Sequence, residues 1–266
     1  MSLLISGDLR LRRTWQPMDP DAAAYIAAVE AADTQALEQG TKIAIDNFVL
    51  GCKEDGIWTA IKASCILAGA RTLSGALVPL AGTAPTNFNF VSGDYNRKTG
   101  LAGDGSTKYL NSNRPNAADP QSSRHQAIFV TIGESTALTA VYIGGGGNGF
   151  TAIAKSSTNV LTAFSSSTAT SVDIADQGNT TGFKGTNRSV SNQASLRSGG
   201  STATGSTTSN AENTTRTIAV FAQNFTTVSF YNNARLAFYS IGESLNLALL
   251  DARVTDLINA FAAAIP

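Results

Sequence analysis

The stretch Gln126–Lys155 reads QAIFVTI, GEST, ALTAVYI, GGGGNG and FTAIAK in order, and it indicates the fold. Three short apolar runs, at 126–132, 137–143 and 150–155, are separated by turn-forming residues. Similar alternations recur from Gly69 onward and predict further strands at 86–91, 108–112, 160–165, 171–175, 191–196, 217–223 and 227–231. Many short strands with regular turn signals are typical of an antiparallel β-sandwich or barrel.

Helical spacing of apolar residues is confined to the two ends of the chain. It predicts N-terminal helices at 22–32, capped by Asp21, at 41–53 and at 57–67. It also predicts a C-terminal helix at 244–265, capped by Ser244, whose apolar stripe consists of Leu247, Leu250, Val254, Leu257, Phe261 and Ile265. Between residues 70 and 243 the sequence predicts no helix of convincing length.

Composition divides the chain into three parts: an arm at 1–20, a helical segment at 21–70, and a β domain at 71–266 closed by the helix 244–265. Basic and apolar residues alternate in the arm, which predicts a short strand. This strand is either a solvated edge or an anchor on a partner, and the candidate anchoring residues are Arg10, Arg12, Arg13 and Trp15. The Ser/Thr-rich run 195–215 is alternatively a flexible loop.

The overall composition excludes several classes of function. The chain carries 19 basic and 19 acidic side chains, whereas a nucleic-acid binder usually shows an excess of Lys and Arg. The single histidine excludes a metal site built from several imidazoles. Cys52 and Cys65 have neither a zinc-finger nor a disulfide spacing, so we expect free, buried thiols. No signal peptide and no bilayer-spanning stretch is predicted, so we expect no membrane insertion.

Three sequence patterns resemble catalytic sites, but the residues around each of them do not fit the chemistry. The run Gly144–Gly149 matches the dinucleotide-binding pattern, but a predicted strand follows it where a phosphate-binding helix is required. The six glutamates are dispersed, whereas glycoside hydrolysis needs two carboxylates about 5 to 9 Å apart. A serine triad would need His125 as its base, and nothing distinguishes the nearby serines. We therefore predict no enzymatic activity and no cofactor.

Binding remains as the chemistry that the sequence favours. Tyr95, Tyr109, Tyr142 and Tyr231 are candidate platforms for sugar rings, and ordinary packing within strands is the alternative for each. Asp94 and Asp104 are candidate calcium ligands, although turn-forming Asp residues give the same pattern without a metal. No resident metal is predicted.

Two groups of segments resemble known families. Leu101–Leu110 (LAGDGSTKYL) resembles the early Asp-Gly-x-x-x-Tyr hairpin of laminin-G-like, concanavalin A-like jelly rolls, and Thr217–Leu245 resembles their closing part. The region 48–109, with GCKEDGIW at 51–58 and NFNFVSGDYNRKTG at 87–100, resembles virion proteins of bacteriophages that infect cyanobacteria and marine bacteria. Arg235–Leu245 (RLAFYSIGESL) is similar to the C-terminal signature of the same group.

The resemblance implies a mainly β, antiparallel jelly-roll (concanavalin A-like) sandwich in a structural protein of a tailed phage. We expect a component of the tail fibre or baseplate that attaches to host-surface glycan. A head-decoration protein that makes only protein–protein contacts is the alternative, and a glycan-degrading enzyme is a third hypothesis. The expected location is the virion, and the expected partners are other virion proteins and further copies of the chain, with a trimer favoured.

Overall fold

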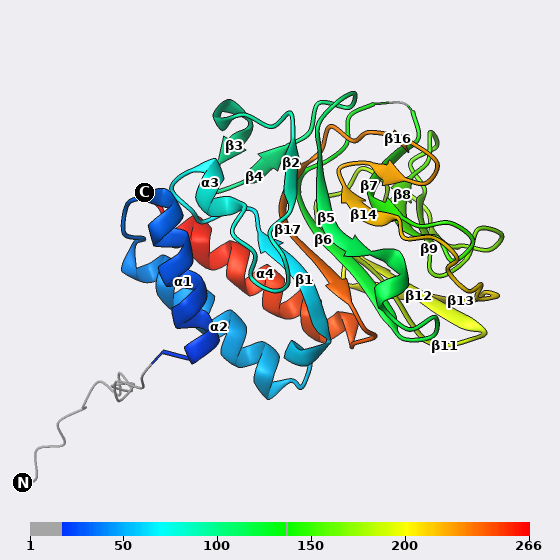
Figure 1. Cartoon of the computed structure of the whole chain (residues 1–266), viewed down its shortest axis with the longest axis horizontal. Helices are drawn as coiled ribbons and strands as arrows, with labels where there is room; N and C mark the ends of the chain where they lie inside the picture. The colour runs from blue at the N-terminus through cyan, green and yellow to red at the C-terminus, as the bar shows by residue number, and fades with distance from the viewer. Residues whose placement is uncertain (1–17, 137) are drawn as a thin grey trace, which may run out of the picture.

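The computed structural model describes residues 18–136 and 138–266. Two sheets, antiparallel apart from one short pair, pack face to face in a jelly-roll sandwich, and helices cover the outer face of one sheet (Figure 1). That sheet, called the helix-side sheet, runs in the order β13-β12-β11-β6-β17-β4-β3, with β1 paired to β17. Its strands are β1 (Ile61–Ile66), β3 (Tyr95–Asn96), β4 (Gly100–Ala102), β6 (Arg124–Ile132), β11 (Gly182–Val190), β12 (Gln193–Ser198), β13 (Ser201–Ser206) and β17 (Arg235–Gly242).

The second sheet, called the outer sheet, runs in the order β10-β9-β8-β7-β14-β5-β2, and the short strands β15 and β16 extend it. Its strands are β2 (Thr86–Phe88), β5 (Tyr109–Pro115), β7 (Ala140–Gly145), β8 (Thr151–Lys155), β9 (Leu161–Phe164), β10 (Val172–Ile174), β14 (Thr217–Val220), β15 (Gln223–Asn224) and β16 (Val228–Ser229). All ten strands predicted from the sequence overlap an observed strand.

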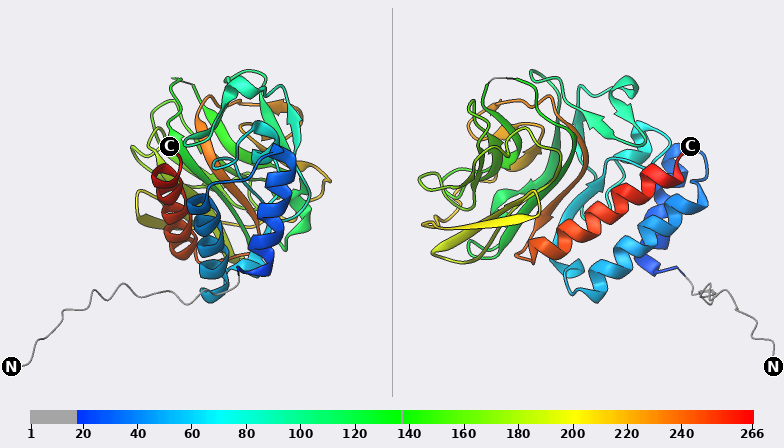
Figure 2. Two further views of the ribbon diagram at one scale, coloured as in Figure 1. Left: turned by 90° about the vertical axis from the view of Figure 1, so that its left-hand side faces the viewer. Right: turned by 180° about the vertical axis from the view of Figure 1, so that it is seen from behind.

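Three helices form a layer against the helix-side sheet: α1 (Pro20–Asp33), α2 (Gln39–Glu54) and α4 (Leu247–Ala264) (Figure 2). A fourth helix, α3 (Leu73–Ala76), is a single turn, and 3-10 turns occur at Trp58–Ala60, Ser92–Asp94 and Asn116–Ala118. The predicted stripe of α4 is confirmed, because its apolar residues are buried against the sheet and the other helices. The N-cap of α4 is Asn246 rather than Ser244, and its side chain accepts the amides of Ala248 and Leu249.

The predicted helix at 57–67 is wrong, because Ile61–Ile66 forms β1 and pairs with β17. Ile61 and Ile66 pack into the core beneath the helices, whereas Ala63 and Cys65 pack into the core between the sheets. A strand buried on both faces lacks the alternation of apolar and polar residues that distinguishes it from a helix. Cys65 therefore lies on a strand, and both cysteines are free and buried as expected.

The Ser/Thr-rich run 195–215 is not a loop over its first half. β12 and β13 form a hairpin around Gly199 and Gly200, whose φ angles of 57° and 76° suit a tight two-residue turn. Residues 207–216 have no regular secondary structure. Thr202, Thr204 and Ser206 share the face of β13 that points away from the core, where hydroxyl side chains are well accommodated.

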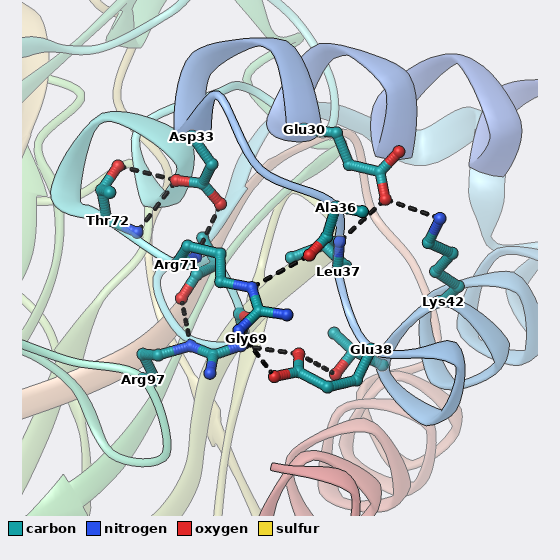
Figure 3. Close-up of polar contacts among 12 residues, drawn as sticks. Glu30, Asp33, Ala36, Leu37, Glu38, Lys42, Gly69, Arg71, Thr72 and Arg97 are labelled. Atoms are coloured by element: carbon teal, nitrogen blue, oxygen red, sulfur yellow. Dashed lines mark hydrogen bonds and ion pairs between the residues drawn. The ribbon is translucent and has the colours of Figure 1, made fainter. Parts of the chain in front are cut away.

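The turn between α1 and α2 is fixed to the sandwich by polar contacts (Figure 3). The Asp33 carboxylate accepts the backbone N–H groups of Arg71 at 2.6 Å and Thr72 at 2.9 Å, and the Thr72 hydroxyl at 2.6 Å. Glu38 pairs with Arg71 at 3.0 Å and with Arg97 at 2.7 Å. The helical layer is therefore joined to the β-sandwich by partly buried hydrogen bonds and ion pairs as well as by apolar packing.

Four basic side chains of the described residues are buried and fix loops by donating to oxygen atoms. They are Arg124, Lys155, Lys184 and Arg188. The Lys184 ammonium donates to the Gln177 carbonyl at 2.6 Å and to the Thr180 hydroxyl at 2.8 Å. Burial without a carboxylate partner carries a desolvation cost, so these contacts must offset it.

Candidate functional site

An aromatic cluster on the outer sheet is the candidate binding surface, and it consists of Phe88, Tyr109 and Tyr231. The rings of Phe88 and Tyr109 are stacked, with centroids 4.3 Å apart and planes at 5°. The Tyr231 ring meets Tyr109 edge-on, at 6.2 Å and 63°. Phe88 is 37% exposed, and both tyrosines are half-buried.

Strand register brings the first two rings together. Phe88 lies directly opposite Tyr109 in the β2–β5 pair, and Thr86 lies opposite Asn111 two residues farther along. Residues two apart on a strand share a face, so these four side chains lie on the same face of the outer sheet. Leu110, between Tyr109 and Asn111, is buried in the core between the sheets, which identifies the aromatic face as the outer one.

Uncharged polar groups lie beside the cluster. Asn113 donates to the Thr86 hydroxyl at 3.0 Å and to the Ala84 carbonyl at 2.8 Å, and Thr86 and Asn113 are exposed. Burial, with a contribution from nearby Tyr231, raises the pKa of Tyr109, so the Tyr109 hydroxyl stays protonated at neutral pH. The surface combines aromatic rings with amide and hydroxyl groups, which is the chemistry that fixes a sugar ring and its hydroxyls.

The two candidate calcium ligands are occupied by the protein itself. The Asp94 carboxylate pairs with Lys108 at 2.6 Å and accepts the Val91 N–H. Asp104 accepts the N–H groups of Ser106, Thr107 and Lys108. Burial opposes its ionisation, but these bonds and the Thr107 hydroxyl lower the pKa of Asp104 well below its usual range. Among residues 18–136 and 138–266, no three His, Cys, Asp or Glu side chains form a metal-binding group.

Two of the four candidate tyrosines are structural rather than exposed. Tyr142 is fully buried between the sheets and donates to the Gly178 carbonyl at 2.5 Å. Tyr95 packs against both cores and donates to the Ala70 carbonyl at 2.8 Å. Burial raises the pKa of both hydroxyls. The expectation that Tyr95 and Tyr142 are platforms is therefore corrected, whereas Tyr109 and Tyr231 lie together.

Phe88 was not among the sequence candidates. The expected strand at 86–91 would place Phe88 and Phe90 on the same face. The observed strand β2 ends at Phe88, because Asn89 adopts a left-handed conformation with φ of 68°. Phe90 is consequently buried against Phe221, while Phe88 stays outside. An Asn between two aromatic residues was the available signal, since Asn tolerates positive φ better than most residues.

The predicted anchoring residues Arg10, Arg12, Arg13 and Trp15 lie outside the described residues. Among the helices of residues 18–136 and 138–266, none has the length and apolar character needed to cross a bilayer.

His125 and Ser240 form a contact that resembles a catalytic pair. The imidazole Nε2 lies 2.7 Å from the Ser240 hydroxyl, and Nδ1 lies 2.6 Å from the Glu243 carbonyl oxygen. The carbonyl can only accept, so Nδ1 carries the proton and Nε2 accepts from Ser240. Both side chains are buried, at 1% and 0% exposure, so a substrate cannot reach them.

Acid is expected to destabilise the protein through His125. Burial lowers its pKa from 6.5 to about 4, so the unfolded chain binds the proton first as the pH falls. Neutral His125 contributes fully to the free energy of unfolding above pH 6.5. As the pH falls from 6.5 to 4, that free energy decreases by about 3 kcal/mol. Urea unfolding across this range should show a smaller loss for His125→Asn, which keeps a donor for the Glu243 carbonyl. Parallel losses in both proteins would show that other groups dominate.

Comparison with known proteins finds similarity in structure alone. No protein-family model matches the sequence, and no curated protein matches it. A Trypanosoma rangeli sialidase mutant that displays trans-sialidase activity is similar over 81% of this chain and 39% of its own, with a TM-score of 0.49 and 11% identity. The sialyllactose-bound CBM40 of Ruminococcus gnavus IT-sialidase is similar over 56% and 91%, respectively, with a TM-score of 0.39 and 9% identity.

A leech intramolecular trans-sialidase is similar over 55% of this chain, with a TM-score of 0.36 and 7% identity. The chain spans 24% of that enzyme and 39% of the trypanosomal one. The jelly-roll assignment rests on the sheet order of this chain and not on these similarities.

Proposed function

We propose that this chain is a structural protein of a phage virion, in a tail fibre or baseplate, whose jelly roll attaches to host-surface glycan. The stacked Phe88–Tyr109 pair with Tyr231 beside it supports the binding role. The family resemblance of the sequence supports the virion role. The proposed role is binding without cleavage, because glycoside hydrolysis needs two facing carboxylates and the side chains described around the rings offer amide and hydroxyl groups.

The cluster favours uncharged sugars as ligands. Thr86, Asn111 and Asn113 offer hydroxyl and amide groups around the rings, whereas Lys108 is engaged by Asp94. An acidic sugar needs a free cation for its carboxylate, and a neutral hexopyranose needs an apolar ring face and short polar partners. We infer that neutral hexose polymers of the cell envelope are the ligand class.

Replacing Phe88 by alanine is expected to weaken glycan binding at least tenfold, or about 1.4 kcal/mol, because the stacking surface is removed. The measurement is isothermal titration with neutral oligosaccharides selected on a glycan array, for the wild type and Phe88→Ala. Leu138→Ala is the matched control, because Leu138 is 72% exposed and lies outside the cluster.

Equal loss of affinity in Leu138→Ala, or retained affinity in Phe88→Ala, would place the binding surface elsewhere. If the array shows no affinity for any glycan, the head-decoration hypothesis replaces the adhesin. Antibody labelling of intact virions is an independent test, because an attachment protein should label the tail and a decoration protein the head.

A further inference from the structure

The free edges of the two sheets differ sharply in length and chemistry. β2, β3 and β10 end their sheets with three, two and three residues, respectively. The outer edge of β1 is covered, because Ser64 is bridged to Ala81. Short length and coverage are the usual ways in which proteins protect sheet edges from pairing with other chains.

β13 has none of these protections. It contains six residues, Ser-Thr-Ala-Thr-Gly-Ser at 201–206, with no charge and no proline, and it pairs with β12 in unbroken register. Within the described residues, β12 is its sole strand partner, so its other edge is open. It lies on the side of the sandwich remote from α1 (Figure 1).

The two faces of β13 are chemically distinct. Ala203 packs against the core between the sheets, and a Cβ at Gly205 would lie 3.2 Å from a Val172 methyl, so small residues face inward. Thr202 and Thr204 face outward, where they line a groove of ≈ 290 Å³ together with Asn187, Gln193, Ser195 and Asn246. This groove, like the edge, is lined by uncharged groups.

The edge is complementary to itself. An antiparallel pairing about a two-fold axis at Thr204 places Thr202 opposite Ser206 of the second copy, so that hydroxyls face hydroxyls. The same register places Ala203 opposite Gly205 of the second copy, so that small inward residues also match. Threonine and serine pairs across strands are favourable, and the absence of charge removes the repulsion that would oppose identical edges.

We propose that a second copy of this chain pairs with β13 in this way and extends the eight-stranded sheet across a two-fold interface. Each β13 edge pairs with the other, so the assembly closes at two copies and leaves no β13 edge open for further pairing. The inference is independent of the glycan-binding proposal.

Sedimentation velocity over a range of micromolar concentrations tests the pairing. The wild type should dimerise, and Thr204→Lys should weaken dimerisation at least tenfold, because two ammonium groups then face each other across the axis. Thr83→Lys is the control, since Thr83 is exposed and lies in the loop before β2. Thermal melting of each variant verifies folding.

A second readout does not depend on how Thr204→Lys folds. Opposed residues in an antiparallel pair have Cα atoms about 4.5 to 5.5 Å apart, within reach of a disulfide. Thr204→Cys should therefore form a covalent dimer under mild oxidation, and the buried native cysteines should not interfere. A monomeric wild type, a folded Thr204→Lys variant that still assembles, or the absence of the disulfide would overturn the proposal.

Discussion

Replacing Arg188 by methionine is expected to lower the free energy of unfolding by about 4 kcal/mol, because several buried oxygens lose their donor at once. The guanidinium is fully buried and donates to the carbonyls of Ser165 at 2.7 Å, Ser191 at 2.8 Å and Val190 at 3.3 Å. It also donates to the carbonyl and hydroxyl of Thr207. Methionine fills much of the space but cannot donate a hydrogen bond.

Urea unfolding of Arg188→Met and of Arg197→Met provides the comparison. Arg197 is half-buried and pairs with Asp251 at 2.8 Å, so its loss should cost about 1 kcal/mol or less. If Arg188→Met were as stable as Arg197→Met, the carbonyls around Arg188 would have another source of donors. The loop anchoring assigned to the buried basic residues would then be wrong.

Lys184→Met is expected to change the pH dependence of stability strongly. Burial lowers the pKa of Lys184 from 10.5 to about 7. Between these values the unfolded chain holds a proton that the folded chain has released, so this group makes stability rise with pH. Its contribution to the free energy of unfolding between these pH values is about 5 kcal/mol by linkage.

The test is the difference in unfolding free energy between the wild type and Lys184→Met at pH 7 and at pH 10. The free energy of unfolding of the wild type should increase relative to that of the variant as the pH rises. The loss of the contacts with Gln177 and Thr180 lowers the stability of the variant at both pH values and does not change this trend. Other alkaline titrations affect both proteins and cancel. A difference that stays constant with pH would show that Lys184 remains protonated in the folded protein.

The sequence predicted an element correctly where one of its faces is exposed to solvent. The stripe of α4 and the helix α2 were predicted because polar residues mark their solvent sides, whereas α1 was predicted from the helical spacing of Tyr25, Ile26 and Val29 among alanines. Prediction failed at β1, which is buried by helices on one face and by the outer sheet on the other. β11 and β17 were also not assigned from the alternation of their residues. Both lie inside the helix-side sheet, and residues on both faces of each are buried.

The candidate site was predictable in chemistry but not in geometry. The sequence indicated tyrosines as platforms, and the fold places Tyr109 beside Tyr231 while burying Tyr142. No local pattern reports which face of a sandwich strand points outward when both strand faces carry apolar residues. The third ring of the cluster, Phe88, was not predicted, because its exposure depends on the left-handed conformation of Asn89.

The location of a bound sugar on the protein tests the central proposal most directly. The measurement is a structure, or an NMR map of the aromatic resonances, with a neutral oligosaccharide at saturating concentration. We predict that the apolar face of a hexopyranose lies against Phe88 and Tyr231, with hydroxyls directed to Asn111 and Asn113. A sugar bound elsewhere, with the signals of Phe88, Tyr109 and Tyr231 unchanged, would contradict it.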